Sequence, residues 1–133
     1  MGDVSPNFSR AEFACKCGCG ADAVDPILVM NLERMRAEAG GPIVIISACR
    51  CENHNREEGG KADSAHLCVP EKKEWCQAVD IVAATGRDLF RLLHAAISAG
   101  FTRIGIGKDF LHVDIDPLKP QEVVWLYPGG ENG

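Results

Sequence analysis

The stretch Arg103-Ile-Gly-Ile-Gly-Lys-Asp-Phe-Leu-His-Val-Asp-Ile115 decides the fold, because it holds two short apolar runs on either side of a polar turn. Residues 103–107 and 110–115 are apolar, contain β-branched side chains and are bounded by glycine or polar residues, which predicts two strands. The same signals predict three more strands, over residues 42–47, 78–82 and 123–127.

Two helices are expected outside these strands. Asp25 is a good N-cap, Pro26 suits the first helical position, and Gly40 ends the apolar pattern that follows. A second helix is predicted over about residues 87–98, which carry one apolar stripe. Residues 1–23 are rich in turns and residues 50–77 resemble a loop. The sequence therefore predicts one α+β domain over residues 1–133, with a small, mostly antiparallel sheet, two main helices and a frayed tail at 128–133.

Composition narrows the class of protein. The 133 residues carry 14 basic and 19 acidic side chains, a net charge of −5 with no basic cluster, which argues against a nucleic-acid partner. No apolar run approaches the roughly 18 residues of a membrane-spanning helix. Residues 1–13 lack the basic flank and apolar core of a secretory signal, so we expect synthesis in a reducing cytoplasm.

Three residues predict a metal site. Asp80 and His112 interrupt apolar strand patterns, and a buried carboxylate is costly unless it is paired or bound to a metal. His66 follows a polar loop and completes a set of two histidines and one carboxylate. Such a set holds a catalytic zinc ion with one position left open for water.

At this point the sequence resembles a known family, the M15 zinc peptidases, which includes D-alanyl-D-alanine carboxypeptidases and phage endolysins. The family's hallmark is Ser-x-His-x-x-Gly-x-Ala-x-Asp, followed by a second histidine near an acidic residue. The similarity covers roughly residues 7–127. It rests on Ser64-Ala-His66, Ala78-Val-Asp80, Asp109-Phe-Leu-His112, Ile45-Ile-Ser-Ala-Cys-Arg-Cys51, Asn55, Gly59-Gly60 and Asn7-Phe-Ser-Arg-Ala-Glu-Phe13.

The resemblance implies a fold of the hedgehog and DD-peptidase type and assigns roles by position. His66, Asp80 and His112 would bind one catalytic zinc ion. Asp109, three residues before the second histidine, would be the general base that takes a proton from the metal-bound water.

The other roles concern residues around the metal. The resemblance gives Arg50 the task of opposing the oxyanion or holding substrate. It makes Ser64 a substrate-binding residue that lies next to the metal ligands or directly behind them. Asp114 shares a strand face with His112, so we expect it to orient this histidine from behind and not to bind the metal itself.

The sequence departs from the family between the first two ligands. Fourteen positions separate His66 from Asp80, whereas the family motif separates them by seven. The extra residues lie within 68–76, and Cys76 stands where the family has glycine. We expect either a flap bearing Trp75 or an altered substrate choice, with loss of activity as a further alternative. Trp125 is expected to serve strand packing rather than to contact ligand.

Seven cysteines exclude complete disulfide pairing within one chain. Cys15, Cys17 and Cys19 alternate, which is not the spacing of a zinc ribbon, so free thiols are favoured over a second, structural zinc. Cys68 and Cys76 bracket the insertion. One alternative is a disulfide between them, formed outside the cytoplasm, and the other is two buried or free thiols.

The resemblance implies a monomeric peptidase that cuts peptidoglycan stem peptides at the bacterial cell wall, reached through a membrane pore during phage lysis. The bond would be D-Ala-D-Ala or L-Ala-D-Glu. Two alternatives stay open. One is a catalytically silent zinc module that binds wall peptides or a protein, and the other is a purely structural cysteine–zinc protein.

Overall fold

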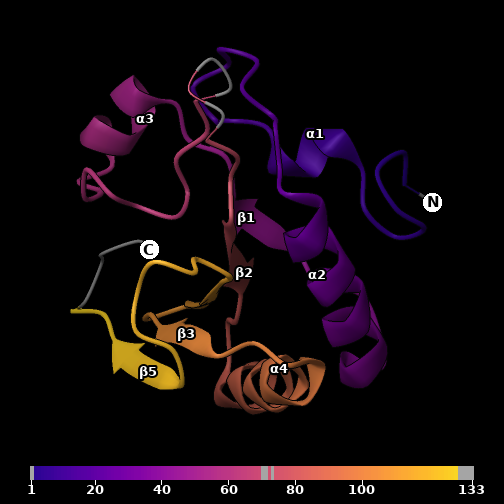
Figure 1. Cartoon of the computed structure of the whole chain (residues 1–133). Coiled ribbons are helices and arrows are strands. Elements are labelled where there is room, and N and C mark those ends of the chain that lie inside the picture. The colour runs from indigo at the N-terminus through magenta and orange to yellow at the C-terminus, as the bar shows by residue number, and fades with distance from the viewer. Residues whose placement is uncertain (1, 70–71, 73, 129–133) are drawn as a thin grey trace.

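A five-stranded sheet in the order β1-β2-β4-β3-β5 forms the centre of the computed structural model, which describes residues 2–69, 72 and 74–128 (Figure 1). All neighbouring strands are antiparallel except β3 and β5, so the sheet is mixed and mostly antiparallel. The α+β prediction is confirmed. The strands are β1 (Ile45–Ser47), β2 (Ala78–Val82), β3 (Arg103–Ile106), β4 (Phe110–Asp114) and β5 (Val123–Leu126).

Two long helices, α2 (Pro26–Ala39) and α4 (Gly86–Ala99), pack against each other and against the sheet (Figure 1). The Asp25 carboxylate caps α2 by accepting a hydrogen bond from a backbone N–H at 2.8 Å, as its sequence predicts. Both helices end at a glycine with left-handed backbone, Gly40 and Gly100. Local capping signals therefore set the ends of both helices.

Strand alternation divides the sheet into two faces. In β2 and β4 the odd-numbered side chains belong to the core together with the helices, and the even-numbered ones point the other way. This second face carries the polar residues Asp80, His112 and Asp114. The core residues of these strands and helices are Val79, Ile81, Leu111, Val113, Leu28, Leu32, Met35, Leu92, Ala95 and Ala96.

Two short helices were not expected from the sequence, α1 (Arg10–Phe13) and α3 (Glu52–Glu57). The prediction of a loop over 50–77 is wrong for α3. This helix buries only Asn55 and has no apolar stripe, so periodicity could not reveal it. Its N-cap is Cys51, whose sulfur accepts a hydrogen bond from the His54 N–H at 3.4 Å.

Glu33 of α2 anchors the N-terminal segment. Its carboxylate accepts hydrogen bonds from the Ser5 hydroxyl at 2.6 Å, the Asn7 side chain at 2.6 Å and the Asn7 N–H at 2.8 Å. Partial burial raises the pKa of Glu33, but these donors outweigh it and hold the pKa below 4.5. The opening motif around Asn7 thus serves to attach the N-terminus to α2.

Among the described residues, no helix has the length and apolar character needed to cross a membrane. Most of the expected frayed tail, residues 129–133, lies outside the described residues, as do residues 70, 71 and 73 of the insertion. Cys68 and Cys76 at the ends of the insertion are buried free thiols.

Candidate metal centre

The polar face of the sheet brings two of the predicted ligands together by register. Asp80 of β2 is paired with His112 of β4, and Gly105 and Trp125 continue the same row across β3 and β5. Neighbouring strands lie about 4.8 Å apart, so paired side chains on one face are in contact range. The sheet therefore holds Asp80 and His112 side by side on rigid backbone.

His66 reaches this face from the loop between α3 and β2. Its backbone pairs with Arg50, whose N–H donates to the His66 carbonyl at 2.8 Å. The His66 Nδ1 lies 2.7 Å from the Ala48 carbonyl oxygen, which can only accept, so Nδ1 carries the proton. Nε2 is thereby left as the lone-pair nitrogen, and it faces Asp80 Oδ1 at 3.3 Å.

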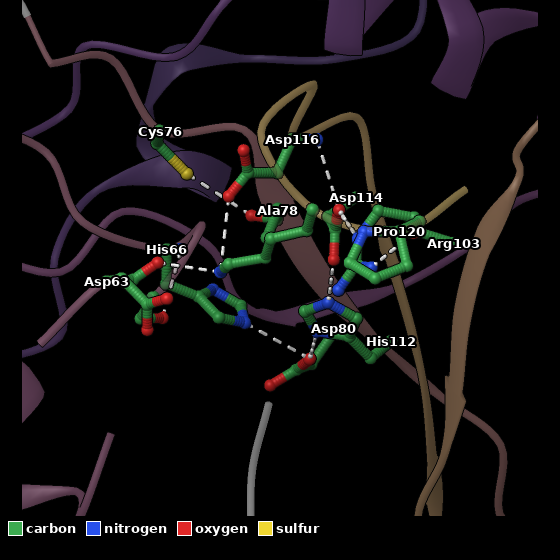
Figure 2. A network of polar contacts seen from close by, with 12 residues as sticks. Asp63, His66, Cys76, Ala78, Asp80, Arg103, His112, Asp114, Asp116 and Pro120 are labelled. Atoms are coloured by element: carbon green, nitrogen blue, oxygen red, sulfur yellow. Dashed lines mark hydrogen bonds and ion pairs between the residues drawn. The ribbon is translucent and has the colours of Figure 1, made fainter. Parts of the chain in front are cut away.

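The second histidine is oriented from behind. His112 Nδ1 lies 3.0 Å from Asp80 Oδ1, and its other nitrogen, Nε2, lies 2.7 Å from Asp114 Oδ2. Arg103 Nε donates to the other oxygen of Asp114 at 2.7 Å. Figure 2 shows this continuous chain of contacts from His66 through Asp80, His112 and Asp114 to Arg103. Asp114 thus lies behind His112, between this ring and the Arg103 guanidinium, where it can orient the ring.

Burial and charge set the protonation of these groups. Burial lowers the pKa of His66, which favours the neutral ring. Burial raises the pKa of Asp80, but the charges and hydrogen bonds of the two histidines outweigh it and hold the pKa well below its usual range. Burial likewise lowers the pKa of His112, yet the hydrogen bonds to Asp114 and Asp80 raise it overall. Asp80 is therefore an ionised carboxylate between the two histidine rings.

The donor set fits a zinc ion. One ligand atom from each of His66, Asp80 and His112 lies within 4.8 Å of the others. Among the described residues, His66 Nε2 and Asp80 Oδ2 are buried and make no hydrogen bond. Unsatisfied buried polar atoms are rare, and a metal ion would satisfy them. Two imidazoles and a carboxylate match a catalytic zinc site with a fourth position open.

Arg50 and Ser64 both lie near the ligands. The Arg50 guanidinium is buried, 3.6 Å from Asp80 Oδ2 and 3.4 Å from the Ser47 hydroxyl. It does not line the adjoining cavity, so in this structure it supports the Asp80 carboxylate rather than facing the open space. Ser64 lines the cavity, and its hydroxyl accepts a hydrogen bond from the His66 N–H at 3.2 Å.

Asp109 is not brought to the site. It is exposed, lies in the turn before β4 and is absent from the cavity lining. Strand register explains this placement, because Asp109 lies three positions from His112, which is about 10 Å along a strand. Asp109 is a candidate base because of its place in the family motif, three residues before His112. That spacing along the sequence does not bring it to the ligands in this structure.

A cavity of about 550 Å³ adjoins the site at His112 and Ser64. Its walls include Asp63 and Lys61 on one side and Trp125 and Tyr127 of the C-terminal segment on the other. Strand packing, the role predicted for Trp125, does not account for all of its contacts. Its ring lies 5.4 Å from the His112 ring and 4.8 Å from the Arg103 guanidinium carbon. Burial raises the pKa of Tyr127, so its phenol stays neutral.

Tyr127, Asp63 and Gly105 also belong to this region, although they were not predicted from the sequence. A Cβ on Gly105 would lie 2.6 Å from Trp125 Nε1 and from Tyr127 Cε2, so glycine is what allows both rings to lie across the strand. A glycine inside a strand often marks a place where other groups approach the backbone closely. Of these three residues, Gly105 is therefore the one that the sequence could have indicated.

Comparison with known proteins agrees with this geometry. A search of the curated proteins gives no match. The family model described as Peptidase M15 matches residues 6–116, most of the 133-residue chain and all three candidate ligands. The chain belongs to the M15 peptidase family.

Proposed function

We propose that this protein is a zinc-dependent peptidase that hydrolyses peptidoglycan stem peptides. The observation that carries the proposal is the buried set of His66, Asp80 and His112, in which His66 Nε2 and Asp80 Oδ2 make no hydrogen bond to a described residue, beside a cavity of about 550 Å³. Membership in the M15 family supports peptidase chemistry in general. The substrate class rests on the resemblance to its peptidoglycan-cutting members.

The residues around the ion have separable tasks. His66 Nε2, Asp80 and His112 Nδ1 would hold zinc, which when bound supplies a water of lowered pKa and a polarised carbonyl. With zinc bound, Asp114 would hold the proton of His112 on Nε2, so that the Nδ1 lone pair, which faces Asp80 here, would be available to the metal. Arg50 supports the carboxylate of Asp80, since its guanidinium lies 3.6 Å from Asp80 Oδ2.

The cavity suits an anionic peptide. Lys61 is exposed at its wall, while Trp125 and Tyr127 offer an apolar surface opposite. Stem peptides carry free carboxylates and small aliphatic side chains, which match a cation and aromatic rings. The bond cut would be D-Ala-D-Ala or L-Ala-D-Glu, and the protein would act at the bacterial cell wall as a monomer, in the manner of an endolysin.

Two carboxylates, Asp109 and Asp63, are candidates for the general base, and variants of each can be compared directly. Resemblance assigns this role to Asp109, whereas Asp63 is the exposed carboxylate in the cavity wall next to Ser64 and His66. We expect Asp63→Ala to lower kcat at least tenfold with zinc content unchanged if Asp63 is the base. A loss confined to Asp109→Ala would instead mean that the loop before β4 closes on the substrate.

The test of the function is mass spectrometry of purified peptidoglycan after incubation with the zinc-loaded protein and with a chelator-treated sample. Chelator-sensitive release of D-alanine indicates a carboxypeptidase, and new D-Glu amino termini indicate an endopeptidase. Intact peptidoglycan with one zinc bound at the His66–Asp80–His112 set contradicts peptidase action on this substrate.

A second function is a catalytically silent zinc module that binds wall peptides or a protein. The exposed position of Asp109 and the long segment between His66 and Asp80 favour it. In that case the protein would sediment with peptidoglycan without cutting it, and neither Asp63→Ala nor Asp109→Ala would change the binding.

A further inference from the structure

Four cysteine side chains meet at a second place, away from the peptidase site. Cys15 Sγ lies 3.4 Å from Cys17 Sγ and 4.0 Å from Cys51 Sγ, and Cys17 Sγ lies 3.7 Å from Cys51 Sγ. Cys19 joins them, since one sulfur from each of the four lies within 4.8 Å of the others. The spacing of Cys15, Cys17 and Cys19 alone did not predict a site, because Cys51 arrives only through the fold.

The backbone is shaped to bring these sulfurs together. Gly18 and Gly20 have positive φ values of 83° and 88°, and a Cβ on either would meet nothing within 4 Å. Glycine is therefore required there by the turn and not by lack of space. The Cys15 N–H donates to the Ala21 carbonyl at 2.7 Å and closes the loop.

Cys51 is delivered to this loop by the end of the β1 segment. The Cys49 N–H donates to the Phe13 carbonyl at 3.0 Å, which ties the two segments together just before the cluster. Cys51 then begins α3, where the His54 N–H points at its sulfur. This contact fixes the position of the Cys51 sulfur beside the loop.

We propose that Cys15, Cys17, Cys19 and Cys51 bind a structural zinc ion. Zinc bound by four thiolates at about 2.3 Å in a tetrahedron requires sulfurs about 3.8 Å apart, close to the three separations above. A disulfide needs about 2.05 Å, so these thiols are arranged around a common centre and not as bonded pairs. Four sulfur ligands leave no open position, as in structural zinc sites.

The cluster is distinct from the core cysteines, because Cys17 and Cys19 are exposed and Cys51 is partly exposed. The three other cysteines, Cys49, Cys68 and Cys76, are buried in the core and are not part of the group.

The ion would connect the N-terminal loop to the wall of the peptidase site. Cys51 directly follows Arg50, whose guanidinium lies beside Asp80. An ion bound only by the folded chain stabilises that fold by mass action. Its loss should therefore loosen Arg50 and the start of α3 while the helices α2 and α4 remain folded.

Metal content of the full-length protein, purified under reducing conditions, tests the proposal. We expect two zinc ions per chain in the unmodified protein, one in Cys17→Ser/Cys19→Ser and one in His66→Ala/His112→Ala. Cys17 and Cys19 are exposed, so the first pair of changes leaves the core intact. Cys68→Ala, a cysteine outside the cluster, is the matched control and should retain two ions.

Cobalt substitution identifies the ligands independently. In His66→Ala/His112→Ala, bound cobalt should show an intense thiolate-to-metal charge-transfer band that disappears in the additional Cys17→Ser/Cys19→Ser background. One zinc that is lost in His66→Ala/His112→Ala and retained in Cys17→Ser/Cys19→Ser would overturn the thiolate site and leave the proposed peptidase untouched. Disulfides within the cluster in freshly purified, alkylated protein would overturn it as well.

Discussion

Replacement of Asp114 by asparagine tests whether the carboxylate behind His112 sets the zinc affinity of the site. Asp114 uses one oxygen for His112 Nε2 at 2.7 Å and the other for Arg103 Nε at 2.7 Å and the Asp116 N–H at 3.1 Å. All three partners are donors when His112 has the tautomer that ligates through Nδ1. An asparagine of the same shape has one oxygen and one NH₂ group, so it cannot accept on both sides.

Either orientation of the amide disturbs the site. If the oxygen faces Arg103, the NH₂ group faces His112 Nε2 and moves the imidazole proton to Nδ1, the atom that faces Asp80. If the oxygen faces His112, two donors confront each other at Arg103. Loss of such an outer-shell partner weakens metal binding by about 10–100-fold, which corresponds to about 1.4–2.8 kcal/mol.

A competition titration of zinc against a chromophoric chelator measures this loss. Asp116→Asn is the matched control, because Asp116 is a nearby carboxylate paired with Lys119 at 3.1 Å and its side chain does not contact His112. If a folded Asp114→Asn protein binds zinc within twofold of the unmodified protein, the tautomer argument is refuted.

Three further outcomes follow from the structure. The lowered pKa of Glu33 means that its contribution to stability is present above pH 4.5 and is lost as the pH falls below it. Glu33→Gln should therefore lower the free energy of unfolding at neutral pH. In urea unfolding, the stability of this variant should also fall less steeply as the pH is lowered. Gly105→Ala should cost about 1–3 kcal/mol of unfolding free energy because its Cβ would meet Trp125 at 2.6 Å, whereas Gly86→Ala, with nothing within 4 Å, should be neutral or stabilising. Lys61→Met should raise KM for anionic stem peptides with kcat nearly unchanged, and an unchanged KM would remove Lys61 from substrate binding.

Much of the fold could be predicted from local sequence. The five strands and the two long helices lie where short apolar runs, the apolar stripe of residues 87–98, Asp25 and Gly40 indicated, because those signals act within a few residues. The helix α3 escaped prediction because it is short, polar and held by its surroundings rather than by an apolar stripe.

The candidate ligands were also accessible from the sequence. Asp80 and His112 are polar residues at positions that otherwise read as buried strand, and such a cost needs a compensating partner. His66 was added because it completes the two histidines and one carboxylate of a zinc site and matches the family motif, and the structure brings its Nε2 to Asp80.

Tertiary structure decided what depends on register and on distant contacts. Pairing of β2 with β4 sets Asp80 against His112 and leaves Asp109 about 10 Å along the strand, because a motif counts residues and a strand extends them. Cys51 meets Cys15 across 36 positions of chain, a contact that no local spacing encodes. The sequence by itself determined the five strands, the two long helices and the donor types of the His66–Asp80–His112 set. The tertiary structure decided which side chains share each site, because only folding sets distances between residues far apart in the chain.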